Sequence, residues 1–447
     1  MIDSTLTRRN TPDDLISKFR SRRATAAVLG LGYAGLPLAF AFAEAGLTTI
    51  GLDIDSQKIE DIAHGRSYIS HIPSERITRL VNQGTFRAST DFGMLARCDA
   101  AVICVPTPLG EGKTPDLHYV IDTAKAIARH LHSGQLVVLE STTYPGTTEE
   151  IVLPILRATG LEVGKDFFLA YSPEREDPGN SKFTTRTIPK VVGGITDNCL
   201  RVASAVYECV VEQVIPASSA KAAEAVKLLE NIYRSVNIAM VNELKLLFER
   251  MDIDIWEIIA AASTKPFGFS PFYPGPGLGG HCIPIDPFYL SWKAKQFDIS
   301  TRFIELAGEV NTAMPAHVVE RVNDALNLAG KPLKGAEILL IGAAYKRDVN
   351  DTRESPTLAI IRLLEAKQVV VRFHDPYVPV LRSRHLSREM SSSALEKEVL
   401  AASDAVIIVT DHQCIDYQFI VDNTALVVDT RNVTRSCRRS RAAIVKA

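Results

Sequence analysis

The chain lacks the cysteine spacing of a metal centre or of a small disulfide-stabilised domain. Its seven cysteines are scattered, and no two of them form a CxxC pair. A secreted disulfide framework would need paired spacing, and a cysteine-rich zinc site would need clustered ligands. The pattern therefore predicts free thiols in a reducing cytoplasm and no bound metal.

An excess of charge of one sign is also missing. The 50 Lys and Arg residues nearly balance the 52 Asp and Glu residues, and the formal net charge is −2. This balance argues against a general nucleic-acid binder, although a local basic groove for phosphate stays open. Residues 1–23 contain several arginines but no apolar stretch with a cleavage site, so they do not predict a secretory signal.

Long uncharged runs are rare, and the one from Ala24 to Ala43 is long enough to cross a bilayer. It contains Gly30, Gly32, Gly35 and Pro37, however. It therefore resolves better into a buried strand, a tight turn and a buried helix. We expect no membrane insertion.

What is present suits about three soluble domains, because the 447 residues are 46% apolar and 23% charged. Short apolar runs alternate with helix-like segments and predict an α/β fold whose parallel sheet is covered on both faces. The expected strands of this first region are 26–29, 48–52, 100–105, 136–139, 167–171 and 190–192.

The pattern changes near Ala217. Ser218 and Ser219 offer a helix cap, and the chain then runs from Lys221 to Arg250 without glycine or proline. A helix of this length would extend roughly 45 Å. It either threads a core or connects two domains and forms a subunit interface, and we favour the connecting element.

Alternation of strands and helices returns near Lys334, with expected strands at 337–341, 369–373, 405–409 and 425–428. This last region has no second GxGxxG, so any nucleotide there would need other contacts. We divide the chain into a lead-in (1–23), a first α/β domain (24–216), a central helical region (217–330) and a C-terminal α/β domain (331–447).

A dinucleotide-binding signature opens the first domain, with Gly30, Gly32 and Gly35 after a strand and before a helix. The first glycine permits the tight turn, the second admits the pyrophosphate, and the third lets helix and strand pack closely. Asp53 ends the next strand, where a carboxylate accepts from ribose hydroxyls and repels a 2′-phosphate. NAD is therefore expected rather than NADP.

Two further strand ends fall where an open parallel sheet places its ligand crevice. They are Val105-Pro106-Thr107-Pro108 and Glu140-Ser141-Thr142. Each is consistent with a ligand contact and also with ordinary turn chemistry.

Cys282 lies in a glycine-rich loop, after Gly279 and Gly280 and four residues before Asp286. A buried cysteine is usually a small hydrophobe. A glycine loop is an unusual place for a core residue, so we favour a nucleophile. A thiolate that adds to an aldehyde gives a thiohemiacetal, and loss of hydride then gives a thioester that water cleaves.

Lys227 and Asn231 are four residues apart and share one face of the expected long helix. An ammonium and a carboxamide pointing together can stabilise an oxyanion, although the same spacing also suits a solvated face. His281 beside Cys282 resembles a hydrolase dyad, but neighbouring residues seldom orient a base onto its own nucleophile. Zinc is disfavoured because no second thiol or histidine stands at ligand spacing.

These motifs together resemble the UDP-glucose/GDP-mannose dehydrogenase family over about Ala24 to Asn432. The motifs occur in family order, namely the Gly30 turn, Val105-Pro-Thr-Pro, Glu140-Ser-Thr, Ser172-Pro-Glu, Lys227-Leu-Leu-Glu-Asn231, the Cys282 loop and Tyr345 to Pro356. The resemblance implies an N-terminal Rossmann-like NAD domain, a central long-helix dimerisation region and a C-terminal Rossmann-like domain for the UDP-sugar.

The resemblance also implies roles for individual residues. Cys282 is implied as the nucleophile, Lys227, Asn231 and Asp286 as oxyanion and water-activating partners, and Thr142 and Glu174 as groups ordering water. The implied cofactor contacts are Gly30, Gly32, Tyr33, Ala34, Gly35, Asp53, Lys58, Pro106, Thr107, Thr142 and Arg353. The implied substrate contacts are Glu174, Arg175, Lys227, Asn231, Phe272, Tyr273, Gly279 and Lys346.

Within the family, the sequence most resembles the branch acting on UDP-N-acetylglucosamine. The marks are Ser172 to Asn180, Thr264 to Phe269, and Gly275 to Pro287. The second acid after Glu174 is either Glu176 or Asp177. We expect a cytoplasmic homodimeric enzyme that oxidises the sugar C6 alcohol to a carboxylate for surface polysaccharide precursors.

Three other functions stay open at this point. The same reaction could take UDP-N-acetylgalactosamine, UDP-N-acetylmannosamine or UDP-glucose, because one hydroxyl changes only a contact or two. A non-catalytic nucleotide-sugar sensor would keep the fold without needing Cys282, Lys227, Asn231 and Asp286 together. A two-electron hydroxy-acid dehydrogenase would share the Rossmann half and would not need Cys282.

Overall fold

A computed structural model describes residues 11–69, 72–176, 183–280 and 282–447. The first ten residues, His281 and residues 177–180 of the Ser172–Asn180 motif, with Asp177 among them, lie outside this described part. The chain forms two compact units. The first contains the residues up to Glu230 together with Trp292–Ile299, and the second contains Asn231–Ser291 and Ser300–Ala447.

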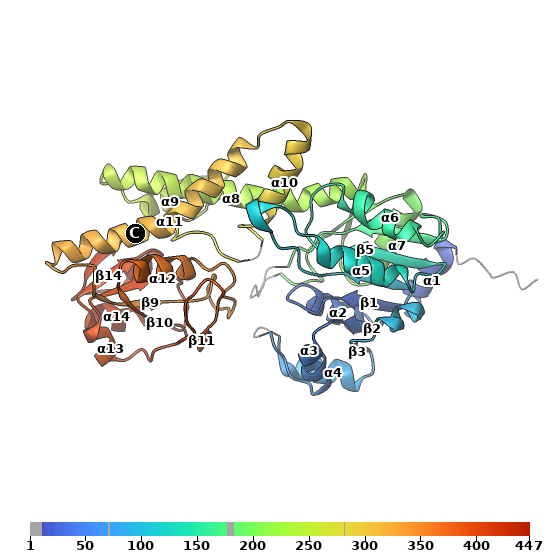
Figure 1. Cartoon of the computed structure of the whole chain (residues 1–447), viewed down its shortest axis with the longest axis horizontal. Helices are drawn as coiled ribbons and strands as arrows, with labels where there is room; N and C mark the ends of the chain where they lie inside the picture. The colour runs from blue at the N-terminus through green and yellow to red at the C-terminus, as the bar shows by residue number, and fades with distance from the viewer. Residues whose placement is uncertain (1–10, 70–71, 177–182, 281) are drawn as a thin grey trace, which may run out of the picture. The chain divides into compact units, whose positions relative to one another are not determined.

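An eight-stranded sheet forms the centre of the first unit, in the order β3-β2-β1-β4-β5-β6-β7-β8 (Figure 1). Neighbouring strands are parallel except β6 and β7, so the sheet is mixed rather than wholly parallel as expected. The strands are β1 (Thr25–Leu29), β2 (Thr48–Leu52), β3 (Phe86–Ser89), β4 (Ala100–Ile103), β5 (Gln135–Leu139), β6 (Phe167–Tyr171), β7 (Lys190–Gly194) and β8 (Val214–Ala217).

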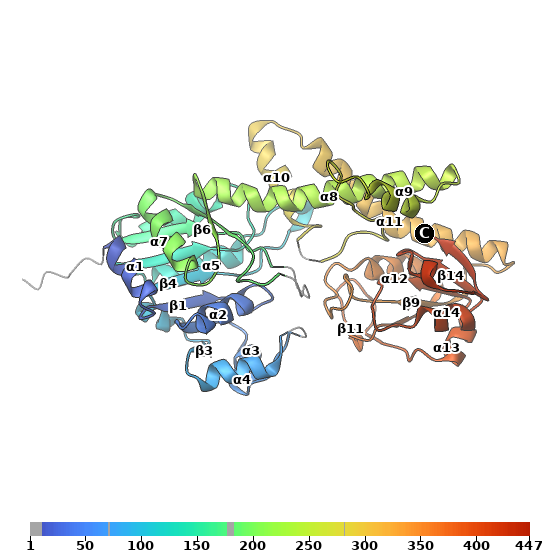
Figure 2. The same cartoon turned by 180° about the vertical axis from the view of Figure 1, so that it is seen from behind.

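Helices cover both faces of this sheet, as the continuous apolar strands predict. Alternate residues of β1 enter different cores: Ala26 and Val28 join one cluster, and Ala27 and Leu29 join the other. The helices are α1 (Pro12–Arg20), α2 (Gly35–Glu44), α3 (Ser56–Ala63), α4 (Ser74–Asn82), α5 (His118–Ala128), α6 (Leu153–Arg157) and α7 (Asp197–Tyr207) (Figure 2), with shorter turns η1 (Phe92–Arg97), η2 (Glu111–Lys113) and η3 (Thr148–Val152).

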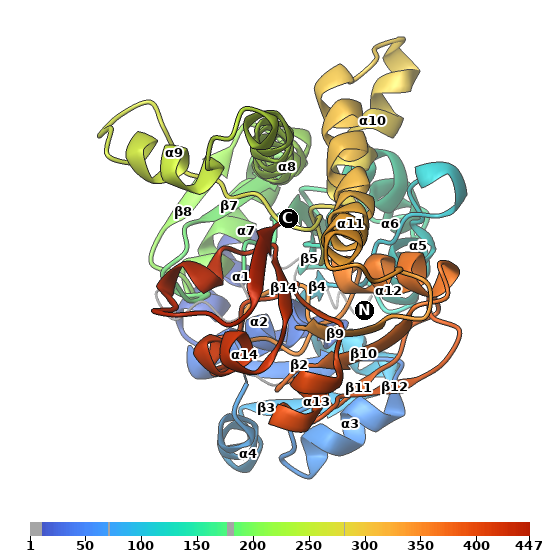
Figure 3. The same cartoon turned by 90° about the vertical axis from the view of Figure 1, so that its left-hand side faces the viewer.

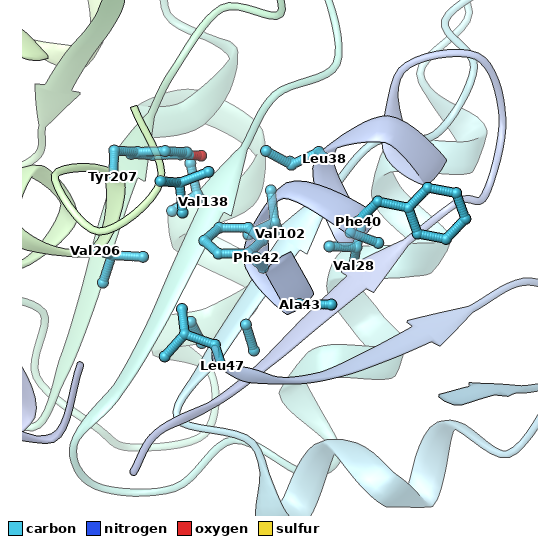
Figure 4. Packing of buried hydrophobic residues seen from close by; sticks show 14 of the residues in the cluster. Val28, Leu38, Phe40, Phe42, Ala43, Leu47, Val102, Val138, Val206 and Tyr207 are labelled. Atoms are coloured by element: carbon cyan, nitrogen blue, oxygen red, sulfur yellow. The ribbon is translucent and has the colours of Figure 1, made fainter. Parts of the chain in front are cut away.

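The uncharged run that could imitate a membrane span is confirmed as strand β1, a glycine turn and helix α2. Phe40 and Phe42 of α2 are fully buried, and Figure 4 shows Phe42 among Val102, Val138 and Tyr207. Burying one such side chain contributes about 1.5–3 kcal/mol. Among the described residues, no helix combines the length and apolarity needed to cross a bilayer.

The predicted long helix is α8, which runs 31 residues from Ala220 to Arg250. The side chain of Ser219 accepts from the amide of Ala222 at 3.1 Å and caps its start. The helix ends where Asp252 adopts a left-handed conformation and the amide of Ile253 returns to the carbonyl of Phe248 at 2.9 Å. Its first turns belong to the first compact unit and the remainder to the second.

A five-stranded parallel sheet forms the core of the second unit, in the order β10-β9-β13-β14-β15 (Figure 3). Its strands are β9 (Glu337–Ile341), β10 (Val370–His374), β13 (Ala405–Ile408), β14 (Leu426–Asp429) and β15 (Ala443–Lys446), beside the hairpin β11 (Val380–Leu381) and β12 (Met390–Ser391). The remaining helices of the chain are α9 (Ile255–Ala262), α10 (Asp286–Ala294), η4 (Lys295–Phe297), α11 (Arg302–Leu328), α12 (Pro356–Ala366), α13 (Lys397–Ala402), α14 (Tyr417–Asn423) and η5 (Val433–Ser436).

Candidate active site

The glycine turn after β1 has the shape that a dinucleotide requires. Gly30 has a φ of 95°, and a Cβ there would stand 2.5 Å from the carbonyl oxygen of Cys104. A Cβ at Gly35 would stand 1.9 Å from the carbonyl oxygen of Gly30. At Gly32, by contrast, a Cβ would meet nothing within 4 Å. Two glycines therefore serve close packing, and the third leaves open space for a pyrophosphate.

Tyr33 and Ala34 belong to this turn, and helix α2 begins at the next residue, Gly35. No side chain caps its first amides, and its first turn contains no acid. The positive end of the helix dipole therefore suits a diphosphate. The residues present fit NAD, which would supply a hydride acceptor when bound.

Asp53 follows β2, beside the glycine turn. Its Oδ2 accepts from the amide of Leu31 at 2.8 Å and its Oδ1 from the amide of Asp55 at 3.0 Å. Lys58 Nζ lies 3.0 Å from Oδ2. These contacts hold the carboxylate at the strand end where a ribose would lie, and they bring Lys58 to it.

The carboxyl ends of β4, β5 and β6 bring three sequence motifs to one edge. Leu139 of β5 pairs in register with Tyr171 of β6, and Thr142 and Glu174 each follow three residues later. Ser141 Oγ donates to the carbonyl of Val105 at 2.7 Å, which ties this loop to the one carrying Pro106 and Thr107. Thr107 is buried, whereas Thr142 is half-buried.

Lys227 of α8 meets Glu174, so two predicted site residues are brought together within the first unit. Its ammonium donates to the Glu174 carbonyl at 2.5 Å and to Oε2 at 3.2 Å. The side chain of Lys227 is only 7% exposed. A lysine buried beside a carboxylate is suited to holding a charge in a water-poor site.

Arg175 and Glu176 follow Glu174 but make different contacts. The guanidinium of Arg175 binds the Pro189 carbonyl at 2.6 Å and Glu230 at 2.7 Å, so its donors are used inside the first unit. The backbone amide of Glu176 donates to the carboxylate of Glu174, and its own carboxylate accepts from Thr185. Burial raises the pKa of Glu176. The other candidate for the second acid, Asp177, lies outside the described residues.

Behind this edge, Glu140 of the Glu140-Ser141-Thr142 motif makes contacts that the sequence did not predict. Glu140, 2% exposed, pairs with Lys190 at 2.7 Å and accepts from the hydroxyl of Tyr207. Burial raises the pKa of Tyr207 well above its usual value. The sequence around Glu140 gave no signal of a partner fifty residues away.

In the second unit, Asn231 and Asp286 form the next predicted contact. Asn231 Nδ2 donates to Asp286 Oδ2 at 2.6 Å, and both residues are buried. Asp286 begins α10, and its amide donates to the Cys282 carbonyl at 2.8 Å. Cys282, half-buried, therefore stands one turn before the start of α10.

The glycine loop before Cys282 packs against the segment after β9. A Cβ at Gly279 would lie 2.6 Å from the Cβ of Tyr345, and Gly280 adopts a φ of 84°. The amide of Gly280 donates to the Arg353 carbonyl at 2.9 Å. Two motifs distant in sequence are thereby held together, because no larger residue fits between them.

Two side chains of this segment, Arg353 and Lys346, are predicted contacts of the cofactor and the substrate. Arg353 makes a two-pronged ion pair with Asp351, at 3.0 and 2.6 Å. Lys346 is half-buried. Upstream, Tyr273 stacks on Trp256 with ring centroids 5.7 Å apart, and Phe272 packs edge-on against Tyr233 at 5.5 Å.

Buried amides fasten the start of the glycine loop. Asn242 of α8 accepts from the amide of Gly275 at 3.0 Å and donates to Asn311 of α11 at 2.9 Å. Asn311 in turn donates to the Ser235 carbonyl at 3.2 Å. No group of three or more candidate metal ligands occurs among the described residues.

The chain matches three consecutive domains of one family. Residues 24–211 match the NAD binding domain of the UDP-glucose/GDP-mannose dehydrogenase family, residues 221–313 its central domain and residues 339–436 its UDP binding domain. These ranges cover most of the sequence and place the glycine turn, α8 and the second sheet in the three domains.

Relatives with different printed substrates are similarly close. The chain is 34% identical to the UDP-N-acetyl-D-glucosamine 6-dehydrogenase of Pseudomonas aeruginosa, over 86% of this chain and 90% of that protein. It is 34% identical to an NDP-N-acetyl-D-galactosaminuronic acid dehydrogenase of Ralstonia nicotianae, over 92% and 96%.

A solved structure matches over nearly the whole fold. The UDP-N-acetylmannosamine dehydrogenase of Pyrococcus horikoshii superposes with a TM-score of 0.84 at 32% identity, covering 94% of this chain and 98% of that one. The glycine turn, the paired sheets and the three domain matches agree. The chain belongs to the UDP-glucose/GDP-mannose dehydrogenase family and is an NAD-dependent UDP-sugar dehydrogenase.

Proposed function

We propose that this enzyme oxidises the C6 alcohol of UDP-N-acetylglucosamine to the carboxylate in two steps that consume two NAD. The observation that carries the four-electron reaction is the position of Cys282 at the start of α10, in a loop clamped by Gly279 and Gly280. One alcohol, two NAD⁺ and one water give one carboxylate, two NADH and three protons.

In the proposed sequence, the first hydride leaves C6 and yields an aldehyde. The Cys282 thiolate then adds to the aldehyde carbon, and the Lys227 ammonium and the Asn231 amide stabilise the resulting oxyanion. Loss of the second hydride leaves a thioester. Water ordered by Thr142 and Glu174 adds to the thioester carbon, and breaking the C–S bond releases the carboxylate and the thiol.

The Asn231–Asp286 pair supports this proposal, because a buried carboxylate can hold the amide in one orientation. The Lys227–Glu174 contact supports it in the same way. For NAD, Gly30, Asp53 and Lys58 supply the turn and the ribose contacts, with Arg353 proposed as a further contact. For the sugar nucleotide, the proposed contacts include Arg175, Phe272, Tyr273, Gly279 and Lys346.

The choice of sugar rests on three sequence marks, Ser172–Asn180, Thr264–Phe269 and Gly275–Pro287. The second candidate is the same reaction on UDP-N-acetylgalactosamine, UDP-N-acetylmannosamine or UDP-glucose. It is favoured by relatives whose printed names carry the first two of these configurations. Comparing kcat/KM over the four sugars at saturating NAD, with product mass, decides between them.

The cysteine step is tested by Cys282→Ser, with Cys437→Ser as the matched control far along the chain. We expect the wild type and the control to form two NADH per sugar and the Cys282 variant to stall after limited turnover. Two NADH per sugar at the normal rate from Cys282→Ser would disprove the nucleophile.

The same assay separates the rival functions. A sensor would bind the UDP-sugar tightly without forming NADH. A two-electron dehydrogenase would form one NADH per substrate and would tolerate loss of Cys282.

We also infer a homodimer through α8. Tyr233, Met240, Leu247 and Met251 follow one another at intervals of seven, seven and four residues, and each is about half exposed (48–56%). Such a stripe is the seam that a second helix covers. Met240→Glu with Leu247→Glu should yield monomers in analytical ultracentrifugation, whereas Arg234→Glu should not, because this exposed residue lies on the same helix but away from the stripe.

The division at 24–216, 217–330 and 331–447 stays a proposal, and the family matches lie close to its limits. The cytoplasm and a role in surface polysaccharide synthesis also stay predictions from the sequence. Cell fractionation would test the location of the enzyme. Analysis of the surface carbohydrate of a deletion strain would test the role in polysaccharide synthesis.

A further inference from the structure

Helix α8 buries a carboxylate that the proposed reaction does not use. Glu224 lies near its start and is fully buried. None of the ion pairs of the described residues includes it. A buried carboxylate without a cation must be satisfied by hydrogen-bond donors, so its partners reveal what it holds.

Three donors from one segment supply this need. The amide of Gly146 donates to Oε2 at 2.5 Å, the amide of Thr148 donates to Oε1 at 2.9 Å, and the Thr148 hydroxyl donates to Oε1 at 2.6 Å. All three come from the end of the connection between β5 and η3. That connection carries Thr142, which the proposed function assigns to ordering water.

The connection is anchored at both ends. At its start, Ser141 Oγ donates to the Val105 carbonyl at 2.7 Å. At its end, Gly146 has a φ of 110°, and only a glycine adopts that turn without strain. Glu224 grips this turn, so Thr142 lies between two fixed points.

Glu224 also shares a helix with a proposed catalytic group. Lys227 follows three residues later and therefore lies on the same side of α8. Through Glu224, the loop that carries Thr142 is held against the helix that carries Lys227. All of these contacts lie within the first compact unit.

The other charges near Glu224 are engaged elsewhere. From η3, Glu149 pairs with Lys221 of α8 at 2.6 Å, and Glu150 pairs with Lys293 of α10 at 2.7 Å. Tyr144 faces the same region, and the Lys293 ammonium lies 4.9 Å from its ring centre. These neighbours add two acids and two cations, so they leave Glu224 to its three donors.

We propose that Glu224 is a positioning residue whose ionised carboxylate holds the 140–148 loop, and with it Thr142, in register with Lys227. The proposal rests on the proposed function for the role of Thr142. The carboxylate accepts all three bonds only when ionised, because a protonated oxygen would face a donor. Protonation therefore loosens the loop.

Burial raises the pKa of Glu224 to about 7, against the hydrogen bonds, which lower it. The 140–148 loop is therefore expected to loosen as the pH falls through about 7. As pH falls through about 7, the wild-type kcat should fall while the KM for the sugar nucleotide changes little.

The main test is Glu224→Gln, which keeps the size but places an NH₂ against backbone donors. Glu149→Gln is the matched control, because it removes a half-buried acid of the neighbouring turn that does not bind Gly146 or Thr148. We expect kcat to fall about tenfold to a hundredfold in Glu224→Gln, since a small misplacement of a reacting group has this effect. Its kcat should also lose the fall below about pH 7. The control should keep the wild-type rate at high pH and the fall of kcat at low pH, moved at most slightly to lower pH because the charge of Glu149 adds to the raised pKa of Glu224.

Hydrogen exchange of the Gly146 and Thr148 amides gives a readout independent of the reaction. We expect these amides to exchange about tenfold faster in Glu224→Gln, since they lose their acceptor. Unchanged exchange, or a wild-type kcat with the same pH profile, would overturn the proposal. A wild type that forms no NADH with any UDP-sugar would instead refute the proposed function, and the exchange result would still judge the loop contact.

If Glu224→Gln does not fold, Thr148→Val replaces it. This variant removes one of the three donors at constant size. It should lower kcat about threefold and speed exchange of the same turn, in line with the loss of one hydrogen bond. Wild-type values for both would overturn the proposal.

Discussion

The two sheets of this enzyme use the same turn for different ends. In the first, Gly30 has a φ of 95° and its amide donates to the Leu52 carbonyl at 2.7 Å. In the second, Gly342 has a φ of 91° and its amide donates to the His374 carbonyl at 2.8 Å. The strand, the left-handed glycine and the neighbouring strand are therefore alike.

The acid that follows the neighbouring strand differs between the two sheets in how many donors it accepts from. Asp53 accepts from two amides and from Lys58. Asp375 accepts from four amides and lies 3.0 Å from a nitrogen of buried His412. Burial raises the pKa of Asp375, but the bonds from His412 and the backbone outweigh it and lower the value. Asp375 therefore accepts from more donors of its own protein than does Asp53, the proposed ribose contact.

The chain after the glycine also differs. Helix α2 begins at Gly35, so its N-terminus lies beside the turn. In the second sheet, helix α12 begins only at Pro356, and the intervening segment holds Gly279 and Gly280 of the cysteine loop. The short connection after Gly30 places a helix N-terminus where an anion can bind. The long connection after Gly342 packs against the cysteine loop. The shared turn thus decides the backbone and not the function.

The largest expected effect comes from replacing the two acids, Asp375 and Asp53, and measuring the loss of stability. Asp375→Asn should cost roughly 3–5 kcal/mol of unfolding free energy, because an NH₂ would face backbone donors in a buried site. Asp53→Asn should cost only about 1–2 kcal/mol, since fewer donors lose their acceptor. Urea unfolding measures both. Equal costs would contradict the difference in saturation.

The cofactor readout of the same pair runs in the opposite direction. Asp53→Asn should raise the KM for NAD about tenfold and narrow the preference over NADP, because it removes the charge that repels a 2′-phosphate. Asp375→Asn, assayed below its unfolding transition, should leave the KM for NAD unchanged.

The two glycines should behave alike in stability and differently in binding. Gly30→Ala places a Cβ 2.5 Å from the Cys104 carbonyl, and Gly342→Ala places one 2.5 Å from Thr410 Cβ. Each should cost about 2 kcal/mol or more through strain and overlap. Gly84→Ala is the control, with a φ of 71° and open space. Calorimetry measures the stabilities of the variants. Only Gly30→Ala should also weaken the binding of NAD.

A buried cation in the second region should contrast with buried Glu224 in the first. Lys245 is 5% exposed, and its ammonium has no hydrogen-bond partner in the described part of the chain. Burial lowers its pKa to about 8, with Arg321 acting in the same direction and Glu249 and Asp429 opposing. The charged form is therefore unfavourable in the folded enzyme.

The sign of the pH effect follows from this lowered pKa. Between about pH 8 and the usual 10.5, the unfolded chain holds a proton that the folded chain has lost, so stability rises with pH. Below about pH 8 the cost is fully present. Lys245→Met should therefore stabilise the protein at pH 7 by about 2–3 kcal/mol, with the gain shrinking toward pH 10 in denaturant titrations. A destabilised variant would show that the amine has a partner.

The smallest effect sharpens the ribose site. Lys58 pairs with Asp53 at 3.0 Å and keeps 31% of its side chain exposed. Lys58→Ala should raise the KM for NAD about two- to fivefold, because a partly exposed pair contributes about 0.5–1 kcal/mol. Thermal stability should stay unchanged. Arg66→Ala removes a comparable exposed pair with Asp61 and serves as the control.

Most of the strands could be predicted because buried parallel strands are short runs of apolar residues. The strands missed were β3, β8 and β15 at sheet edges and the short hairpin strands β11 and β12, all of them partly exposed. Pro216 in β8 also masks the strand, since a proline is tolerated only at such an edge. Strand β7 was predicted, but its antiparallel direction was missed because direction depends on the path of a loop.

The site divides in the same way. The spacing of Gly30, Gly32 and Gly35 and the shared helix face of Lys227 and Asn231 are local, so the sequence predicts them. Glu224 escaped notice because its donors lie more than seventy residues away, at separations of 76 and 78. Its one signal was its place three residues before Lys227, on the same face.

What the sequence by itself determined is the set of local geometries: the glycine turn, the uninterrupted helix α8 and the cysteine one turn before Asp286. These follow from φ preferences and helical period, which act over a few residues. Only the tertiary structure decided which acid finds which donor, as between Asp53 and Asp375. Hydrogen bonds of buried carboxylates depend on the chains that folding brings beside them, and no local pattern encodes those partners.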